Sequence, residues 1–245
     1  ALRRYNGKAM INSVNGKESS MREIFPLVKK YGGVVVALTL DENGIPTTWE
    51  GRVEIAKKIL ATAAEYGIEK KDIIFDTLAM TISADSSAAK ATLKALEYIR
   101  YELGCHTSLG VSNVSFGLPN REAVNSTFFA CVMERGLSAA IMNPYSAGMM
   151  KAYYTFNALH NLDENCSKYI EYATTHEEVA VASATPATKA ASGEGDYGSA
   201  LQKAIAKGLK DQAGLLTKEM LSSVAPLEII QKEIIPALDI VGKGF

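Results

Sequence analysis

The strongest constraint on the fold is a segment in which an apolar strand pattern leads into a polar, glycine-containing loop and then a helix. It reads Gly-Val-Ser-Asn-Val-Ser-Phe-Gly-Leu-Pro-Asn-Arg at residues 110–121. Two upstream segments, at residues 11–16 and 74–78, show the same change from apolar to polar residues. Parallel α/β proteins place their chemistry at strand ends of this kind. The three segments therefore predict a small-molecule site lined by amides and one carboxylate.

Strand-like and helix-like segments alternate from the N-terminus to about residue 160. Apolar or β-branched runs predict strands at residues 8–14, 34–40, 73–75, 108–114 and 139–142. A stretch with helical spacing follows each run. A capping box at residues 20–23 and an N-cap at Asp85 are expected to begin two of these helices. The repeat predicts five β/α units with parallel strands and crossover helices.

Five units are fewer than the eight of a closed (β/α)8 barrel. Residues 2–7 read like the tail of a helix. We therefore expect the α/β part to be a partial TIM barrel, about five of eight units, whose first three units are missing from the beginning. An open doubly wound sheet is the alternative.

The composition changes near residue 180. Residues 181–196 are small and polar, contain Gly and Pro, and lack a periodic apolar face, which is typical of a linker. Apolar stripes over 201–220 and, after Pro226, over 227–241 predict two amphipathic helices that pair as the start of an all-α bundle. The expected organisation is an α/β domain at 1–175, a linker at 176–197 and helices at 198–245.

Composition and charge exclude several classes of protein. The net charge of −1 does not suggest a nucleic-acid or anionic-membrane surface. No apolar run approaches the roughly 20 residues that span a bilayer, and no signal-peptide core follows the first residues. Three widely spaced cysteines without a Cys-x-x-Cys spacing indicate neither a disulfide framework nor a metal site. We expect a cytoplasmic protein.

Three polar residues fall at the carboxyl ends of predicted strands in different units: Asn12, Asp76 and Asn113. Parallel strands bring such ends to one face, so these side chains are expected to converge. Two amides and a carboxylate offer donors and acceptors that complement a planar, nitrogen-rich heterocycle. The structural alternatives are that Asp76 caps a helix and that the asparagines form turns. Asp41 follows a strand at the same edge, but its Asp-Glu-Asn-Gly sequence is largely explained by a turn.

These segments resemble the pterin-binding barrel of the methyltetrahydrofolate:corrinoid methyltransferases, most closely that of the cobalamin-dependent methionine synthases. The likeness covers about residues 1–165 and is carried by residues 11–16, 75–78 and, most specifically, 110–121. Residues 204–209 and 236–242 look like the start of the helical cap that covers methylcobalamin in the same enzymes. The resemblance implies a pterin-binding TIM-barrel domain, a linker and the beginning of a cobalamin-binding cap.

The resemblance also implies an activity. The methyl group of 5-methyltetrahydrofolate would pass to a corrinoid cobalt(I), as part of methionine synthesis from homocysteine. Methyltetrahydrofolate is then the substrate, and cobalamin is bound mainly by domains outside this sequence. The implied partners are a corrinoid-binding domain or protein and a homocysteine-binding zinc module elsewhere. The alternatives are a stand-alone folate:corrinoid methyltransferase, a dihydropteroate-synthase-like enzyme and a non-catalytic pterin-binding fragment.

Residue roles follow from the same resemblance. Asn12 and Asp76 match positions that hydrogen-bond the pterin ring. Asn113 would lie near nitrogen 5, which carries the methyl group, and is the candidate catalytic residue. The positions implied on the aminobenzoyl-glutamate side are Ser112, Ser115 and Arg121. From the residues alone, Arg121 is either a surface residue at a helix start or a clamp for an acidic ligand tail, and neither serine has the surroundings of a nucleophile.

Overall fold

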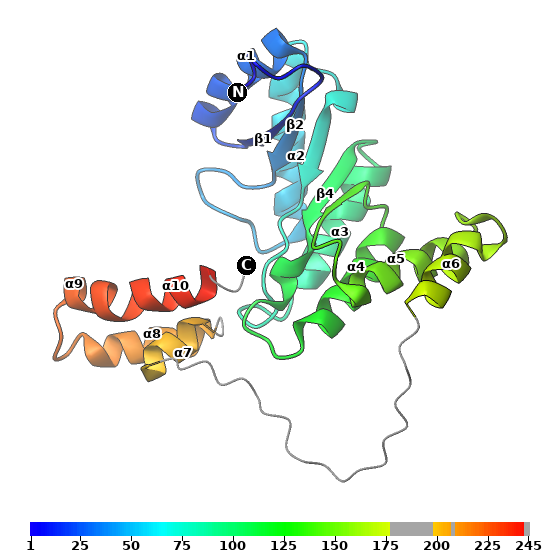
Figure 1. Cartoon of the computed structure of the whole chain (residues 1–245). Helices are drawn as coiled ribbons and strands as arrows, with labels where there is room; N and C mark the ends of the chain where they lie inside the picture. Colours follow the sequence, from blue (N-terminus) through cyan, green and yellow to red (C-terminus); the bar gives the residue numbers. More distant parts are fainter. Residues whose placement is uncertain (177–197, 207–208, 243–245) are drawn as a thin grey trace, which may run out of the picture.

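The computed structural model describes residues 1–176, 198–206 and 209–242. Its first part holds a parallel sheet whose strands keep the order of the sequence (Figure 1). The strands are β1 (Met10–Asn15), β2 (Val34–Leu38), β3 (Ile73–Asp76), β4 (His106–Gly110) and β5 (Ala139–Ile141). The helices that follow them are α1 (Glu18–Tyr31), α2 (Trp49–Glu65), α3 (Ala88–Tyr101), α4 (Arg121–Glu134) and α5 (Ala147–Leu159). The expected α/β class, with five β/α units of a partial (β/α)8 barrel, is confirmed.

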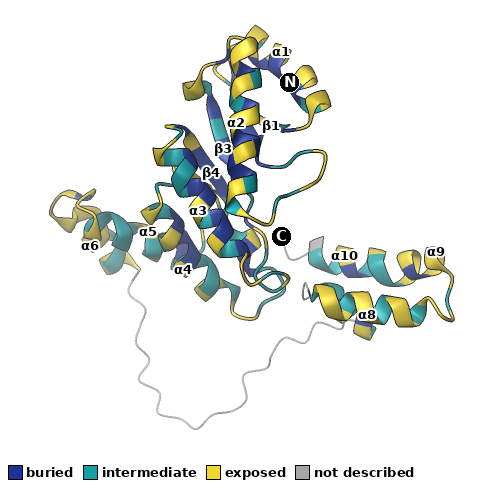
Figure 2. Cartoon of the chain, turned by 180° about the vertical axis from the view of Figure 1, so that it is seen from behind, coloured by how far each residue is buried: buried dark blue, intermediate teal, exposed yellow. Residues whose placement is uncertain are grey.

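Helices cover one face of the sheet over β1 to β4, toward which the apolar residues of these strands alternate, whereas all three residues of β5 are exposed. In Figure 2, α2 and α3 lie in front of the strands, and in Figure 1 β4 lies in front of α3. The strand residues packed with Phe25 of α1 and Ile59 of α2 in one buried cluster are Val14, Val35, Ala37, Ile73 and Phe75. Alternation leaves the other face, the interior side of a barrel, to the residues between them.

Both predicted helix caps are wrong. Helix α1 begins at Glu18 and its N-cap is Lys17, so the helix starts ahead of the expected capping box at 20–23. The Ser20 hydroxyl instead accepts a hydrogen bond from the Asn15 N–H, 3.3 Å away. The Glu42 carboxylate, from the loop after β2, accepts from the Glu18 N–H at 2.9 Å. A neighbouring loop therefore satisfies a helix-end donor that a local cap was expected to satisfy.

Helix α3 likewise begins after Ser87, not after Asp85. The Asp85 carboxylate accepts from the Ser87 N–H at 2.8 Å and from the Ser87 hydroxyl at 2.7 Å. Asp85 thus forms a turn in front of the helix, a common alternative use of this residue type.

Strand β4 ends at Gly110, short of the expected end at residue 114. Val111–Ser115 form a 3₁₀ turn, in which the Phe116 N–H donates to the Asn113 carbonyl. Val111 and Val114 are buried as predicted for apolar positions, but they anchor this turn and not a strand. Asn113 is therefore carried past the end of β4 on a short turn.

A helix that the sequence did not reveal, α6 (Ser167–Thr175), follows α5. The Asp163 carboxylate accepts from the N–H groups of Lys168 at 3.1 Å and Tyr169 at 2.9 Å, in the first turn of α6. The helix packs on α5 through stacked rings, Tyr172 lying between Tyr154 and His176. This aromatic packing gives no aliphatic stripe for a sequence pattern to show.

The C-terminal part is helical. It contains α7 (Ala200–Ala206), α8 (Lys210–Met220), α9 (Pro226–Ile229), a π turn (Ile230–Ile234) and α10 (Ile235–Gly242). The stripe at 201–220 is therefore shared by two helices, whereas the one after Pro226 is continuous. Helix α7 packs on α8 and α10 around buried Leu201 and Ala237. The expected linker lies, apart from residue 176, outside the described residues, and within the described ranges no helix is long and apolar enough to cross a membrane.

We expect Gly16→Ala to destabilise the α/β part by about 1–3 kcal/mol through overpacking. The Gly16 N–H donates to the Leu40 carbonyl at 2.7 Å, and an added Cβ would lie 2.7 Å from Ile55 Cγ2 and 2.9 Å from the Leu40 oxygen. Gly214→Ala in α8 is the control, because its Cβ meets open space and alanine favours a helix by about 1 kcal/mol. Urea unfolding measures both variants; a Gly16→Ala protein as stable as the parent contradicts the close packing of this loop.

Candidate functional site

Asp76 lies at the end of β3, on the sheet face that the helices leave uncovered. Its neighbour Phe75 packs toward the helices, so alternation directs Asp76 to the barrel interior. The residue is 9% exposed. Within the described ranges its carboxylate accepts one hydrogen bond, to Oδ1 from the Leu78 N–H at 2.8 Å. The other oxygen therefore remains available to a donor brought by a ligand.

Burial raises the pKa of Asp76, and the hydrogen bond from Leu78 opposes this shift. Desolvation disfavours the ionised carboxylate, whereas a donated hydrogen bond favours it. A ligand with N–H donors would therefore relieve a carboxylate that the fold desolvates. Such donors occur along the edge of an amino-pyrimidinone.

Two buried hydroxyl groups near Asp76 also lack partners among the described residues. Ser108 of β4 pairs in register with Asp76 and therefore faces the same side of the sheet. Its Oγ and the Oγ1 of Thr77 are both buried without a hydrogen bond. Unsatisfied buried hydroxyls are uncommon and often mark a site for water or a ligand. Sequence reasoning missed both residues, although the inward register of Ser108 follows from the alternation on β4.

Asn12 lies on β1, on the same interior face. It pairs with Val36, and Val36 pairs with Ile74, two residues before Asp76 on β3. Asn12 is therefore one inward-facing row deeper in the barrel than Asp76. It is exposed, and its amide makes no hydrogen bond to the residues that the structure describes.

Asn113 is exposed on the 3₁₀ turn after β4, at the carboxyl edge of the sheet. Its Nδ2 lies 3.1 Å from the place a Cβ on Gly110 would take, so the amide folds back over the strand end. A larger residue at position 110 would require the Asn113 side chain to shift. In the described part of the chain the Asn113 amide, like that of Asn12, has no hydrogen-bond partner. The structure thus places Asp76 at the end of β3 and Asn113 just past the end of β4. Asn12, predicted at a strand end, instead lies in the middle of β1, because that strand continues to Asn15.

Hydrogen bonds link the three residues implied on the aminobenzoyl-glutamate side, Ser112, Ser115 and Arg121. The Arg121 guanidinium donates to the Ser115 hydroxyl at 3.0 Å and to the Ser112 carbonyl at 3.1 Å. It also lies 5.1 Å from the centre of the Phe116 ring. The Ser115 hydroxyl, fully buried, donates to the same Ser112 carbonyl at 3.2 Å. These hydrogen bonds stabilise the loop that carries Asn113.

The loop after β3 is fastened to the loop after β4. The Ile82 N–H donates to the Val114 carbonyl at 3.0 Å, and the Thr81 hydroxyl donates to the Phe116 carbonyl at 2.6 Å. These hydrogen bonds therefore join the loop that follows Asp76 to the loop that carries Asn113.

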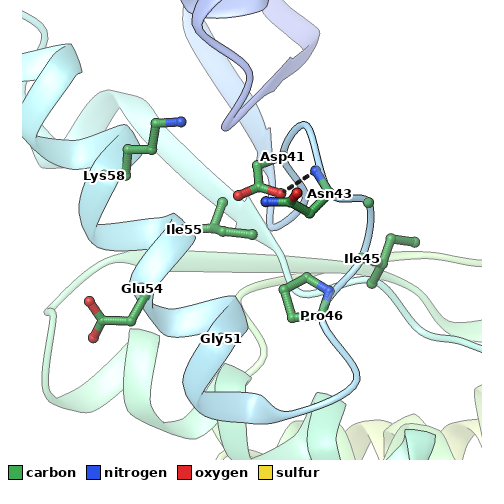
Figure 3. Close-up of a pocket in the computed structure, with 9 residues that line it drawn as sticks. Asp41, Asn43, Ile45, Pro46, Gly51, Glu54, Ile55 and Lys58 are labelled. Carbon is green, nitrogen blue, oxygen red and sulfur yellow. Dashed lines mark hydrogen bonds between the residues drawn. The ribbon is translucent and has the colours of Figure 1, made fainter.

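A separate pocket of about 400 Å³ lies between the loop after β2 and helix α2 (Figure 3). The Asp41 carboxylate there accepts from the Asn43 N–H at 2.8 Å, and Asp41 and Gly44 exchange backbone hydrogen bonds. This is the turn that the sequence predicts, and neither Asn12, Asp76 nor Asn113 lines the pocket. The described residues contain no group of three or more His, Cys, Asp or Glu side chains that could hold a metal ion.

Comparison with known proteins decides the family. Residues 1–143 match the family model described as pterin binding enzyme, and this match covers the strands and loops of the site. The chain belongs to the pterin binding enzymes. Residues 199–245, the helical part of this pterin-binding chain, match a second family model, described as B12 binding domain.

Similar proteins include a methylcorrinoid:tetrahydrofolate methyltransferase and two methionine synthases. A methylcorrinoid:tetrahydrofolate methyltransferase from Eubacterium limosum is 33% identical over 165 residues, which are 65% of this chain and 60% of that enzyme. Methionine synthases from Mycobacterium tuberculosis and Mycobacterium leprae are each 36% identical over 155 residues, 58% of this chain and 13% of theirs. The pterin-binding chain thus spans at most 60% of the length of these relatives.

We expect Asp76→Asn to raise the free energy of unfolding at pH 7 by about 1 kcal/mol, as functional residues often cost stability. Because the native pKa of Asp76 lies above its ordinary value of 3.8, the native state binds the extra proton between the two values. Stability of the parent therefore falls as the pH rises through this window. Asparagine removes the charge and keeps an acceptor for the Leu78 N–H.

Urea unfolding at several pH values measures this difference, which should shrink as the pH falls and vanish below 3.8. Asp239→Asn, on the exposed side of α10, is the control. A less stable Asp76→Asn protein at pH 7 would show that the carboxylate is stabilised by the fold.

Proposed function

We propose that this chain binds 5-methyltetrahydrofolate and takes part in methyl transfer between its nitrogen 5 and the cobalt of a corrinoid. The observation that carries the proposal is a desolvated carboxylate at the end of β3 with two amides that have no hydrogen-bond partner among the described residues, Asn113 just past the end of β4 and Asn12 one row deeper on β1. The match of residues 199–245 to a B12 binding domain supports the corrinoid half of the reaction. The folate and corrinoid named in the Eubacterium limosum relative support both halves.

In the proposed complex Asp76 accepts hydrogen bonds from the amino-pyrimidinone edge of the pterin. Oδ1 is already oriented by the Leu78 N–H, so the second oxygen faces the ligand. Asn12, one row deeper, offers a donor and an acceptor to the rest of the ring edge. Arg121 uses two of its donors on Ser115 and Ser112, which leaves others for the aminobenzoyl-glutamate side.

Asn113 is the residue that we place beside nitrogen 5. A bound corrinoid supplies the cobalt that accepts the methyl group. The folate then leaves as an amine, and a neutral tertiary amine leaves poorly unless its nitrogen gains positive character. An amide that can rotate, with no protein partner to hold it, can accept from protonated nitrogen 5 and donate to the free base. Asn113 thus stabilises the charge that develops in the transition state.

Methionine synthesis is the finer form of the proposal. It is supported by the two methionine synthase relatives. In this form of the proposal the partners are a homocysteine-binding zinc module and a corrinoid-binding domain. A stand-alone folate:corrinoid methyltransferase fits the barrel equally well. Isothermal titration with 5-methyltetrahydrofolate tests binding, and methyl transfer is then assayed with a supplied corrinoid protein. Homocysteine consumption by the assembled system separates the two forms, and binding without transfer indicates a non-catalytic pterin-binding chain.

We expect Asn113→Ala to lower kcat for methyl transfer about 100-fold, the usual effect of losing one transition-state hydrogen bond. The Kd for 5-methyltetrahydrofolate should change less than about threefold, because Asp76 and Asn12 still bind the ring. Asn43→Ala is the matched control, since Asn43 is an exposed amide in another loop at the same edge. Equal losses of binding and transfer would defeat the assignment of Asn113 to nitrogen 5.

A further inference from the structure

Arg52 is a buried cation whose acceptors are all uncharged. It lies in the first turn of α2, is 1% exposed, and is among the largest fully buried side chains. Burial lowers the pKa of its guanidinium, and the charge of Asp85 opposes this shift. A buried charge is costly unless its hydrogen bonds are well made. The burial of this charged group therefore indicates that its hydrogen bonds have a structural role.

The guanidinium joins two loops of the carboxyl edge. Its Nε donates to the Pro46 carbonyl at 2.9 Å, in the loop after β2. Its Nη1 donates to the carbonyls of Thr77 at 2.8 Å and Leu78 at 3.0 Å, in the loop after β3. The Thr92 hydroxyl of α3 accepts from the same Nη1 at 2.8 Å. Arg52 thus holds the segment directly after Asp76 from the helical side of the sheet.

The segment it holds has a conformation that leucine rarely adopts. Leu78 has φ +61°, in the left-handed region. Its N–H donates to Asp76 Oδ1, and its carbonyl accepts from Arg52. The Thr92 hydroxyl lies 3.2 Å from this carbonyl and 3.0 Å from that of Ala88, and its single hydrogen can be donated to either. Both peptide groups of this residue are therefore fixed by side chains. Strained backbone of this kind persists only where its surroundings determine it fully.

We propose that Arg52 is a positioning residue for Asp76. By holding the Thr77 and Leu78 carbonyls it keeps the Leu78 N–H on one carboxylate oxygen and leaves the other oxygen directed to the ligand. Arg52 itself does not touch the pterin. This inference rests on the proposed pterin-binding role of Asp76, and it assigns the affinity of that site in part to a residue on the opposite side of the sheet.

Thr92→Val in the full chain is the mildest test, because it removes one hydroxyl and keeps the side-chain shape. We expect the Kd for 5-methyltetrahydrofolate to rise about tenfold and the amide exchange of Leu78 to accelerate about tenfold. Thr62→Val is the matched control. The Thr62 hydroxyl lies 3.1 Å from the carbonyl four residues earlier, as the Thr92 hydroxyl lies 3.0 Å from its own, but Thr62 makes no contact with Arg52 or Leu78 among the described residues. Arg52→Gln should show the larger effect, and Arg52→Lys should restore part of it.

A double-mutant cycle separates positioning from general destabilisation. If Arg52 and Thr92 act through Asp76, Thr92→Val should cause no further loss of affinity in an Asp76→Ala background, which lacks the acceptor for the Leu78 N–H. Equal fold-losses in both backgrounds, or unchanged Leu78 exchange in folded Arg52→Gln, would overturn the proposal. If the parent chain fails to bind 5-methyltetrahydrofolate, the proposed function fails, and the Leu78 exchange rates still decide whether Arg52 fixes the Asp76 turn.

Discussion

Side-chain alternation along parallel strands is the constraint on which this site depends. Val35, Ala37 and Phe75 must face the helices to form the core, and the residues between them are then forced to the other face. Asp76 and Ser108 lie in this second set and are adjacent in register. The burial that stabilises the fold therefore also fixes where its polar groups stand. A slip of one residue in β3 would exchange Asp76 for Phe75 and destroy the core and the site together.

The sequence predicts most of this arrangement, and its failures have local physical causes. Five β/α units follow from hydrophobic periodicity, because each helix and strand buries a regular stripe. The end of β4 cannot be predicted in this way, because buried apolar residues such as Val111 and Val114 are expected both in a strand and in a buried turn. The cap of α1 was missed because its donor is satisfied by Glu42 from a different loop. A hydrogen bond between residues distant in sequence, such as that from the Glu18 N–H to Glu42, cannot be predicted from the local residue pattern at the helix start.

The same limit explains which site residues were predictable. Asp76, Asn12 and Asn113 can be recognised in the sequence, because each is a polar residue toward the end of a predicted apolar strand. Arg52 gives no such signal, because an arginine in the first turn of an amphipathic helix is expected on its solvated side. Only the positions of the Thr77 and Leu78 carbonyls show why it is buried. Supporting residues of a site are therefore harder to predict than the residues they support.

Two arginines support this edge in the same way. Arg52 lies in the first turn of α2 and Arg121 is the first residue of α4, positions where the helix dipole disfavours a cation. Both donate to backbone carbonyls of loops at the carboxyl ends of strands, Arg52 to the loop after Asp76 and Arg121 to the loop that carries Asn113. A carbonyl-rich loop is an electrostatic environment that offsets the unfavourable dipole, and a guanidinium reaches several carbonyls at once. The loop that follows Asp76 and the loop that carries Asn113 are thus each fixed by a cation on the side away from the ligand, and Arg52 presents no charge to the ligand.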